Sequence, residues 1–172
     1  MTLINRRHGA ASKVKEEGRR EENTMITLSE IMTENPFTLG PENSLKQAVE
    51  LMSQEKIRHI PIVNHEHQLL GLVTLSDVLA SRESKLFVIT QEREAEFTDS
   101  VRLDEIMTRN VAWVDPHAGI KEAALYLQRH KYGCLPVVER GKLVGIVTDS
   151  DFIGVAINLL EVMEEREPDS DA

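Results

Sequence analysis

The feature of this chain that most constrains its fold is a segment that occurs twice. The run GLVTLSD at residues 71–77 returns as GIVTDSD at residues 145–151. Upstream of these runs, residues 28–63 align with residues 103–138 without a gap. The one difference in length falls between the two predicted strands of each copy, where a hairpin turn tolerates it. A duplication of this kind predicts two copies of one structural unit.

Hydrophobic periodicity assigns the elements of each copy. Short extended runs at residues 36–39 and 110–114 come first, and Ser44 with Gln47 has the spacing of a capping box at the start of a helix. Two nearly continuous apolar runs then predict a strand pair that is buried on both faces. Each unit is therefore expected to be β-α-β-β-α. The predicted fold is α/β (α+β), with two pseudo-symmetric repeats packed sheet to sheet.

The last helix of each copy differs in its predicted length. It is brief from Ser76 and long from Ser150. Five apolar residues predict the inner face of the long helix: Phe152, Val155, Ala156, Leu159 and Leu160.

Composition and charge set the predicted boundaries. These are a polar, disordered N-terminal tail (1–24), a first repeat (25–81), a linker (82–100) whose apolar run 86–90 could add a strand, a second repeat (101–163) and a polar C-terminal tail (164–172).

The composition also restricts the location and the partners that we expect. No run approaches the roughly 20 apolar residues of a membrane span, and the N-terminus lacks the apolar region of a secretory signal. The single cysteine, Cys134, agrees with a reducing compartment, so we expect a cytoplasmic protein without a membrane partner. With 20 basic and 29 acidic residues the net charge is −9, which disfavours nucleic acid as a partner.

The repeated motif has a chemistry of its own. Thr74 and Thr148 end a buried strand where a helix begins, so a hydroxyl and free backbone N–H groups converge there and favour a phosphate. Three residues on, the carboxylates of Asp77 and Asp151 can accept hydrogen bonds from the two hydroxyls of a ribose. The same Thr-x-x-Asp spacing also makes a capping box that needs no ligand. Both interpretations remain open at this point.

The ordered set of motifs resembles the tandem CBS domain module, named after cystathionine β-synthase. The likeness covers residues 26–163 and rests on matched features: IMT before the first strand, IPIV and LPVV on the second, and GLVTLSD and GIVTDSD on the third. The resemblance implies a regulatory module that binds adenosine derivatives in clefts between its two repeats. It also implies a homodimer, commonly disc-shaped, and an unidentified regulated protein as partner.

The resemblance assigns roles to residues in both copies. It implies ribose contacts from Asp77 and Asp151, phosphate contacts from Thr74, Ser76, Arg58, Thr148, Ser150 and Lys131, and adenine contacts from His59, Ile60, Tyr132, Gly133 and Cys134. The expected ligand is AMP, ADP or ATP, alone or with Mg²⁺, and no obligatory cofactor is expected. S-adenosylmethionine and a dinucleotide stay open as ligands, because they contain the same adenosine. Each cleft would be built by both repeats. Because Asp149 stands where the first copy has Leu75, the two clefts are expected to bind unequally.

Other functions are less well supported by the residues. One alternative is a protein-interaction scaffold whose clefts stay empty and whose motifs are only caps, and another is a nucleic-acid-binding module. No nucleophile and base set or phosphate-binding loop indicates an enzyme. His65 and His67 fit a solvated turn better than a metal site, Cys134 fits a small buried residue, and Trp113 fits the core.

Overall fold

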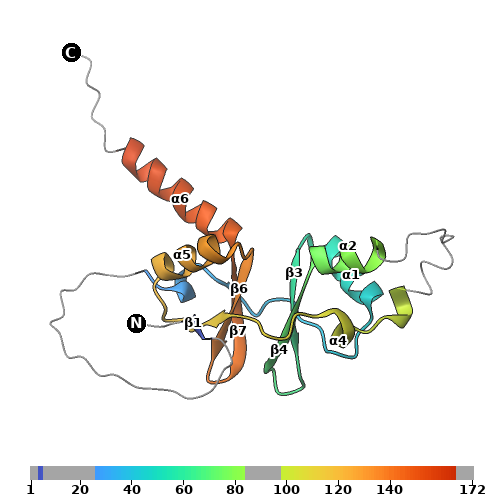
Figure 1. Ribbon diagram of the computed structural model, residues 1–172. Coiled ribbons are helices and arrows are strands. Elements are labelled where there is room, and N and C mark those ends of the chain that lie inside the picture. The colour runs from blue at the N-terminus through green and yellow to red at the C-terminus, as the bar shows by residue number, and fades with distance from the viewer. Residues whose placement is uncertain (1–3, 6–25, 84–97, 166–172) are drawn as a thin grey trace, which may run out of the picture.

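The computed structural model describes residues 4–5, 26–83 and 98–165. Two sheets face each other in the middle of the molecule, and helices cover their outer sides (Figure 1). This arrangement confirms the predicted α/β fold of two units packed sheet to sheet. Val63, Val138 and Leu143 form the buried cluster where the two hairpins meet, and the Leu143 N–H donates across this contact to the His67 carbonyl at 2.9 Å.

The first unit contains one antiparallel hairpin and two helices. Its elements are α1 (Leu45–Glu55), β3 (His59–Val63), β4 (Leu69–Thr74) and α2 (Leu75–Glu83). The expected strand at residues 36–39 is reduced to one parallel bridge, between Leu39 and Ile62. Apolar residues of the strands and of α1 form a core in which Ile60, Ile62 and Leu45 are fully buried.

The second unit contains a larger sheet. Its elements are β5 (Trp113–Val114), α5 (Ile120–His130), β6 (Cys134–Glu139), β7 (Lys142–Thr148) and α6 (Asp149–Glu164). Two further strands, β1 (Ile4–Asn5) and β2 (Thr33–Glu34), complete the sheet in the order β1-β5-β6-β7-β2. β1 pairs with β5, so these two residues of the predicted N-terminal tail are part of the sheet. The apolar run 86–90 lies outside the described residues.

The segment before each repeat packs on the other repeat. β2 pairs with β7, and Leu28 from the turn Leu28–Glu30 is fully buried in the core of the second unit. In the same way, Leu103 of α4 (Leu103–Ile106) is fully buried in the core of the first unit. Neither sequence repeat is therefore a packing unit by itself, because each one completes the core of the other.

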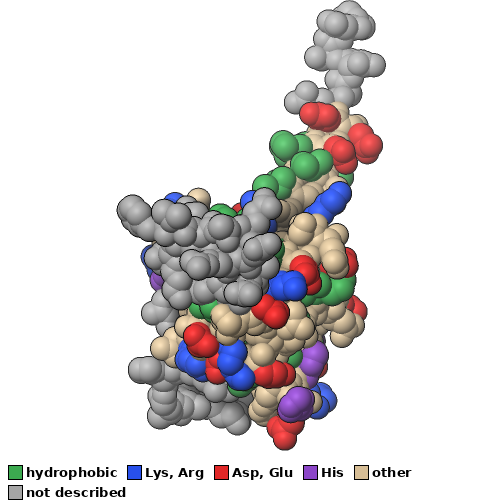
Figure 2. Space-filling model, turned by 90° about the vertical axis from the view of Figure 1, so that its right-hand side faces the viewer, with side chains coloured by type: hydrophobic (Ala, Val, Ile, Leu, Met, Phe, Trp, Pro, Cys, Tyr) green, Lys and Arg blue, Asp and Glu red, His purple; other side chains and the backbone are tan. Residues whose placement is uncertain are grey.

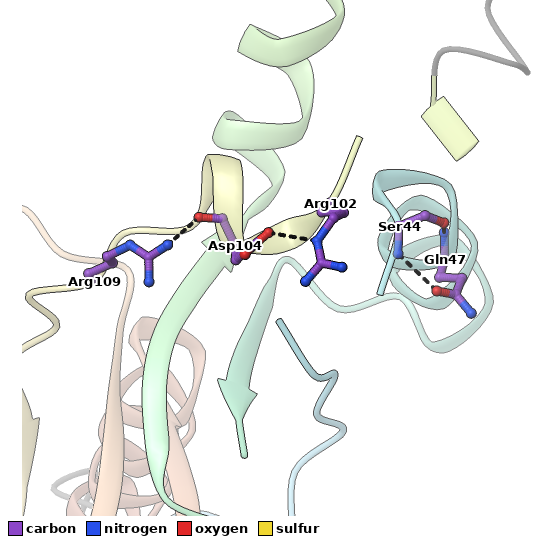
Figure 3. A network of polar contacts seen from close by, with 5 residues as sticks. All are labelled: Ser44, Gln47, Arg102, Asp104 and Arg109. Carbon is purple, nitrogen blue, oxygen red and sulfur yellow. Dashed lines mark hydrogen bonds and ion pairs between the residues drawn. The ribbon is translucent and has the colours of Figure 1, made fainter. Parts of the chain in front are cut away.

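Polar contacts hold the second exchanged segment in place beside the start of α1. The Ser44 N–H donates to Gln47 Oε1 at 2.9 Å, which confirms the predicted capping box, and Ser44 also bridges to the backbone of Arg102 (Figure 3). The Arg102 guanidinium pairs with Asp104 at 3.1 Å, and Arg109 donates to the Asp104 carbonyl at 2.6 Å. This surface network fixes the segment that carries Leu103 into the first core.

The packing of each leading segment on the other repeat, which we call the exchange, explains why the repeated motif begins with a glycine. A Cβ on Gly71 would lie 2.6 Å from Met107 Sδ and 2.9 Å from the Thr108 carbonyl oxygen. Gly145 has the same relation to Met32, whose Sδ would lie 2.5 Å from the added Cβ. The methionine of each IMT motif therefore lies over the glycine of the other repeat.

The predicted inner face of the last helix holds only at its start, where Phe152 packs on the core of the second unit. α6 has no buried residue, and Leu159 and Leu160 are 57% and 58% exposed. The helix leaves the body of the molecule after its first turns instead of packing along it (Figure 1). The apolar residues of α6 do recur at helical spacing, but the described part of this chain does not bury them.

Candidate functional site

A cavity of about 410 Å³ lies between the two repeats. Its lining comes from three segments: residues 33–37, residues 56–59, and the end of β7 with the start of α6 (Ile146 and residues 148–150). This volume lies within the range of small-molecule sites. As expected from the resemblance, both repeats contribute to the lining.

Local structure explains why these segments meet. α1 ends at Lys56 in a left-handed conformation (φ 55°), which turns the chain sharply and places residues 56–59 at the cavity. β2 pairs with β7 and so brings residues 33–37 beside the start of α6. At Thr148 a strand ends and a helix begins, so the first backbone N–H groups of α6 are near the cavity.

The lining combines cations with acids. Lys56 and Arg58 are exposed at the cavity, and Glu34 and Asp149 are acids in the same lining. The N-terminal end of α6 adds a partial positive charge. These groups suit a ligand that carries an anionic part and hydrogen-bonding groups.

His59 lies half-buried at the cavity and next to the second repeat. Its Nε2 is 2.8 Å from the position that a Cβ would take on Gly133, so a larger residue there would clash with the imidazole. Burial lowers the pKa of His59, Arg58 lowers it further, and Asp149 opposes them. The ring therefore favours its neutral form in the folded chain.

Cys134 is buried, as the sequence predicted, with 5% of its surface exposed. Burial, with a smaller contribution from Asp149, raises the pKa of its thiol to about 12. A thiol of this kind stays protonated near neutral pH, which removes its nucleophilic form.

The two motif aspartates form capping boxes. Asp77 Oδ2 accepts from the N–H and the hydroxyl of Thr74 at 2.8 and 2.7 Å. Asp151 Oδ2 accepts from the N–H and the hydroxyl of Thr148 at 2.6 and 2.9 Å. This is the geometry of the capping interpretation, and it involves one carboxylate oxygen of each aspartate.

The structure brings together one part of the predicted site. Arg58, His59, Thr148 and Ser150 line the same cavity, and Asp151 follows directly in α6. The first-repeat equivalents of Thr148, Ser150 and Asp151 do not line this cavity: they are Thr74, at the end of β4, and Ser76 and Asp77, at the start of α2. Ile60 is fully buried in the first core.

Three further predicted residues lie at a second cavity. Lys131, Tyr132 and Gly133 line a space of about 400 Å³ between α5 and α6, together with Asp149 and Phe152. The Tyr132 ring stacks on His130 at a centroid distance of 5.6 Å.

Sequence reasoning missed several residues of the lining. Glu34, Asn35, Phe37 and Lys56 line the cavity, but they lie outside the repeated Thr-x-Ser-Asp motif. Phe37 is 51% exposed, which is unusual for a large aromatic side chain. The available signal was the position of residues 34–37 directly after the IMT motif, which suggests a shared role but not a contact with α6.

The remaining candidates lie apart from the cavity. His65 and His67 are exposed in the turn between β3 and β4, and Trp113 is half-buried in β5. Among the described residues, no group of three or more histidine, cysteine and acidic side chains is placed to hold a metal ion. None of the helices in residues 26–83 and 98–165 combines the length and apolar character that crossing a bilayer requires.

Comparisons with known proteins agree with the duplicated architecture. The family model described as "CBS domain" matches residues 28–84 and 103–158. Among solved structures, the chain is similar to a proposed acetoin utilization protein (AcuB) from Vibrio cholerae, with 46% identity and a TM-score of 0.70, covering 84% of this chain and 99% of that one. It is also similar to CBSX2 of Arabidopsis thaliana, solved in complex with AMP, with 27% identity and a TM-score of 0.66, covering 78% of this chain and 98% of that one.

A curated relative is longer than this chain. The chain is 35% identical over 126 residues to the uncharacterized protein MJ1225 of Methanocaldococcus jannaschii. The match covers 73% of this chain but 41% of that protein, so the chain spans less than half of the relative's length.

Proposed function

This chain belongs to the CBS domain family, and on that premise we propose that it is a regulatory module that senses an adenosine nucleotide such as AMP. The ligand would occupy the cavity between the repeats and change the angle between them or across a dimer. A protein partner would read that change. No catalytic role is assigned to the cavity residues.

The observation that carries the proposal is the composition of the cavity. Arg58 provides a cation for a phosphate, and Ser150 adds a hydroxyl at the N-terminal end of α6. Phe37 offers an exposed aromatic ring that can stack on a base. The AMP complex of CBSX2, a structural neighbour at 27% identity, supports the choice of ligand.

We further propose that the signal passes through a homodimer that covers α6. Six large apolar side chains of α6, between Ile153 and Met163, are 45% to 65% exposed, and hydrophobic atoms are visible along the projecting arm in Figure 2. Leu79 of α2, which aligns with Ile153 of α6, is also 47% exposed. α6 contains acids and no lysine or arginine, whereas the last turn of α5 is basic. A second copy offers both apolar and basic surfaces to α6.

Calorimetric titration with AMP tests the ligand. We expect Arg58→Ala to weaken binding by about tenfold, because it removes a charge-assisted contact with the phosphate. Lys142→Ala is the matched control, since it removes an exposed cation outside the cavity and should leave the affinity unchanged. No heat from AMP, ADP or ATP with the wild-type chain would overturn the proposal.

The capping boxes favour one second candidate, a scaffold that binds no nucleotide. In that case Thr148→Ala would lower thermal stability, and nucleotides would shift the melting temperature of neither the variant nor the wild-type chain. A melting temperature of the wild-type chain that rises with AMP concentration would exclude the scaffold.

The likeness to AcuB indicates which cellular process the module regulates. Because 99% of that chain is covered at 46% identity, we propose that the regulated partner takes part in acetoin utilization. Deletion of the gene should then impair growth on acetoin but not on glucose. Equal growth of the deletion strain on both would contradict this assignment.

A further inference from the structure

The two repeats differ in charge at the first residue of their last helices. Leu75 and Asp149 are the first residues of α2 and α6. The Leu75 N–H donates to the Arg58 carbonyl at 2.9 Å, and the Asp149 N–H donates to the Gly133 carbonyl at 3.1 Å. The two backbones are thus held alike, and only the side chain changes from leucine to a carboxylate. The fold itself does not require an acid here.

The Asp149 carboxylate acts on the cavity. Asp149 is exposed and lies in the lining between Thr148 and Ser150, and it also lines the second cavity. Two titratable groups, His59 in β3 and Cys134 in β6, have shifted pKa values. Burial is the main cause of both shifts: it lowers the pKa of His59 and raises that of Cys134. Asp149 makes a smaller contribution that raises the pKa of both groups, as expected for a carboxylate close to them.

The charged side chains of the lining cancel, which leaves no net positive charge for a highly charged anion. Lys56 and Arg58 face two acids, Glu34 and Asp149. The Ser150 hydroxyl and the N-terminal end of α6 favour one phosphate group. Every further phosphate adds negative charge for which the lining holds no additional cation, and Asp149 repels it.

We propose that Asp149 determines the nucleotide specificity of the cavity, by admitting a nucleoside monophosphate and repelling the triphosphate. This inference rests on the proposed function, because it applies only if the cavity binds an adenosine nucleotide. Asp149 is a specificity residue and makes no attractive contact with the ligand.

Calorimetry with AMP and ATP tests the inference on the full chain, with a chelator present so that no divalent ion screens the phosphates. Asp149→Asn keeps the size and polarity of the side chain, and Asp149→Leu installs the residue of the first repeat. We expect both variants to lower the ratio of the ATP and AMP dissociation constants by about tenfold. Higher salt should reduce this difference. Glu161→Gln is the matched control, because it removes one exposed acid of the same helix outside the cavity.

Each outcome separates the two proposals. An unchanged ratio in Asp149→Asn, with AMP still bound by the wild-type chain, overturns the role of Asp149 and leaves the proposed function standing. A fall of the same size in Glu161→Gln assigns the effect to overall charge and also overturns that role. A wild-type chain that binds neither AMP nor ATP overturns both.

Discussion

Asp151 closes the cap of α6 with one of its two carboxylate oxygens. Oδ2 accepts from the N–H and the hydroxyl of Thr148, whereas neither bond involves Oδ1. Ser150, between them in sequence, is exposed and lines the cavity. The motif therefore divides its work: the threonine and the aspartate shape the start of the helix, and the serine is placed for a ligand. Capping and ligand binding are compatible roles for the same four residues.

This division predicts different effects for neighbouring substitutions. We expect Asp151→Ala to lower the free energy of unfolding by about 1 kcal/mol, because the cap of α6 is lost. Ser150→Ala should leave that free energy nearly unchanged and weaken AMP binding. Urea unfolding and calorimetry measure the two quantities. A large loss of stability in Ser150→Ala, with normal binding, would contradict the division.

His59 predicts a dependence of stability on pH. Because burial lowers its folded-state pKa below the ordinary value of 6.5, the unfolded chain binds a proton more readily than the folded chain. The contribution of the neutral ring is complete above that ordinary value and is lost as pH falls from it towards the lowered pKa. We expect wild-type stability to drop as the pH is lowered below about 6.5. His59→Gln, which does not titrate, should drop less over the same interval in urea unfolding, and an equal drop would refute the assignment to His59.

At the residue scale, the sequence predicted those residues of the cavity that belong to a motif repeated in both copies or lie next to one. The motif and the positions before the IPIV strand led to Arg58, His59, Thr148 and Ser150, which share the cavity. Glu34 could not be found in this way, because it reaches the cavity only through the pairing of β2 with β7. Such a contact between distant segments leaves no local pattern in the sequence.

At the scale of elements, the strand pairs and their helices followed from periodicity, but the exchange of the leading segments did not. IMT is present in both copies, so packing on its own repeat and packing on the other one give the same pattern. The structure decides between them through Gly71 and Gly145, which the methionines of the other repeat cover. Glycine is needed in the strand because a backbone carbonyl and a methionine approach it closely.

The exchange predicts the cost of filling this space. We expect Gly71→Ala to lower the free energy of unfolding by about 1–3 kcal/mol, because the added methyl group would lie 2.9 Å from the Thr108 carbonyl oxygen. Gly154→Ala is the contrasting control: no atom lies within 4 Å of its Cβ position, and alanine should stabilise α6 by about 0.5–1 kcal/mol. Urea unfolding of both variants measures the difference. A neutral Gly71→Ala would show that Met107 does not pack on this glycine in solution.

At the scale of the whole molecule, α6 shows the limit of a hydrophobic pattern. The spacing of Phe152, Val155 and Leu159 indicates a face that is buried, but a pattern does not say which molecule buries it. In the described residues α6 has no buried side chain, and it extends from the body (Figure 1). An apolar helix without cover is unfavourable in water, so the pattern and the structure together favour an intermolecular contact.

The proposed homodimer can be tested on this helix with a matched pair of substitutions. Leu160→Asp places a charge among the exposed apolar residues of α6, where Leu160 is 58% exposed, and burial of that charge against a partner would be costly. Asn158→Asp adds the same charge two residues away, on the polar side of the helix. We expect sedimentation equilibrium to give twice the chain mass of 19.4 kDa for the wild-type chain and for Asn158→Asp, and the single mass for Leu160→Asp. Because α6 packs little against its own chain, Leu160→Asp should melt at nearly the wild-type temperature once both are monomeric at low concentration. If Leu160→Asp remains dimeric, α6 is not the dimer contact, and its apolar residues must meet a different protein.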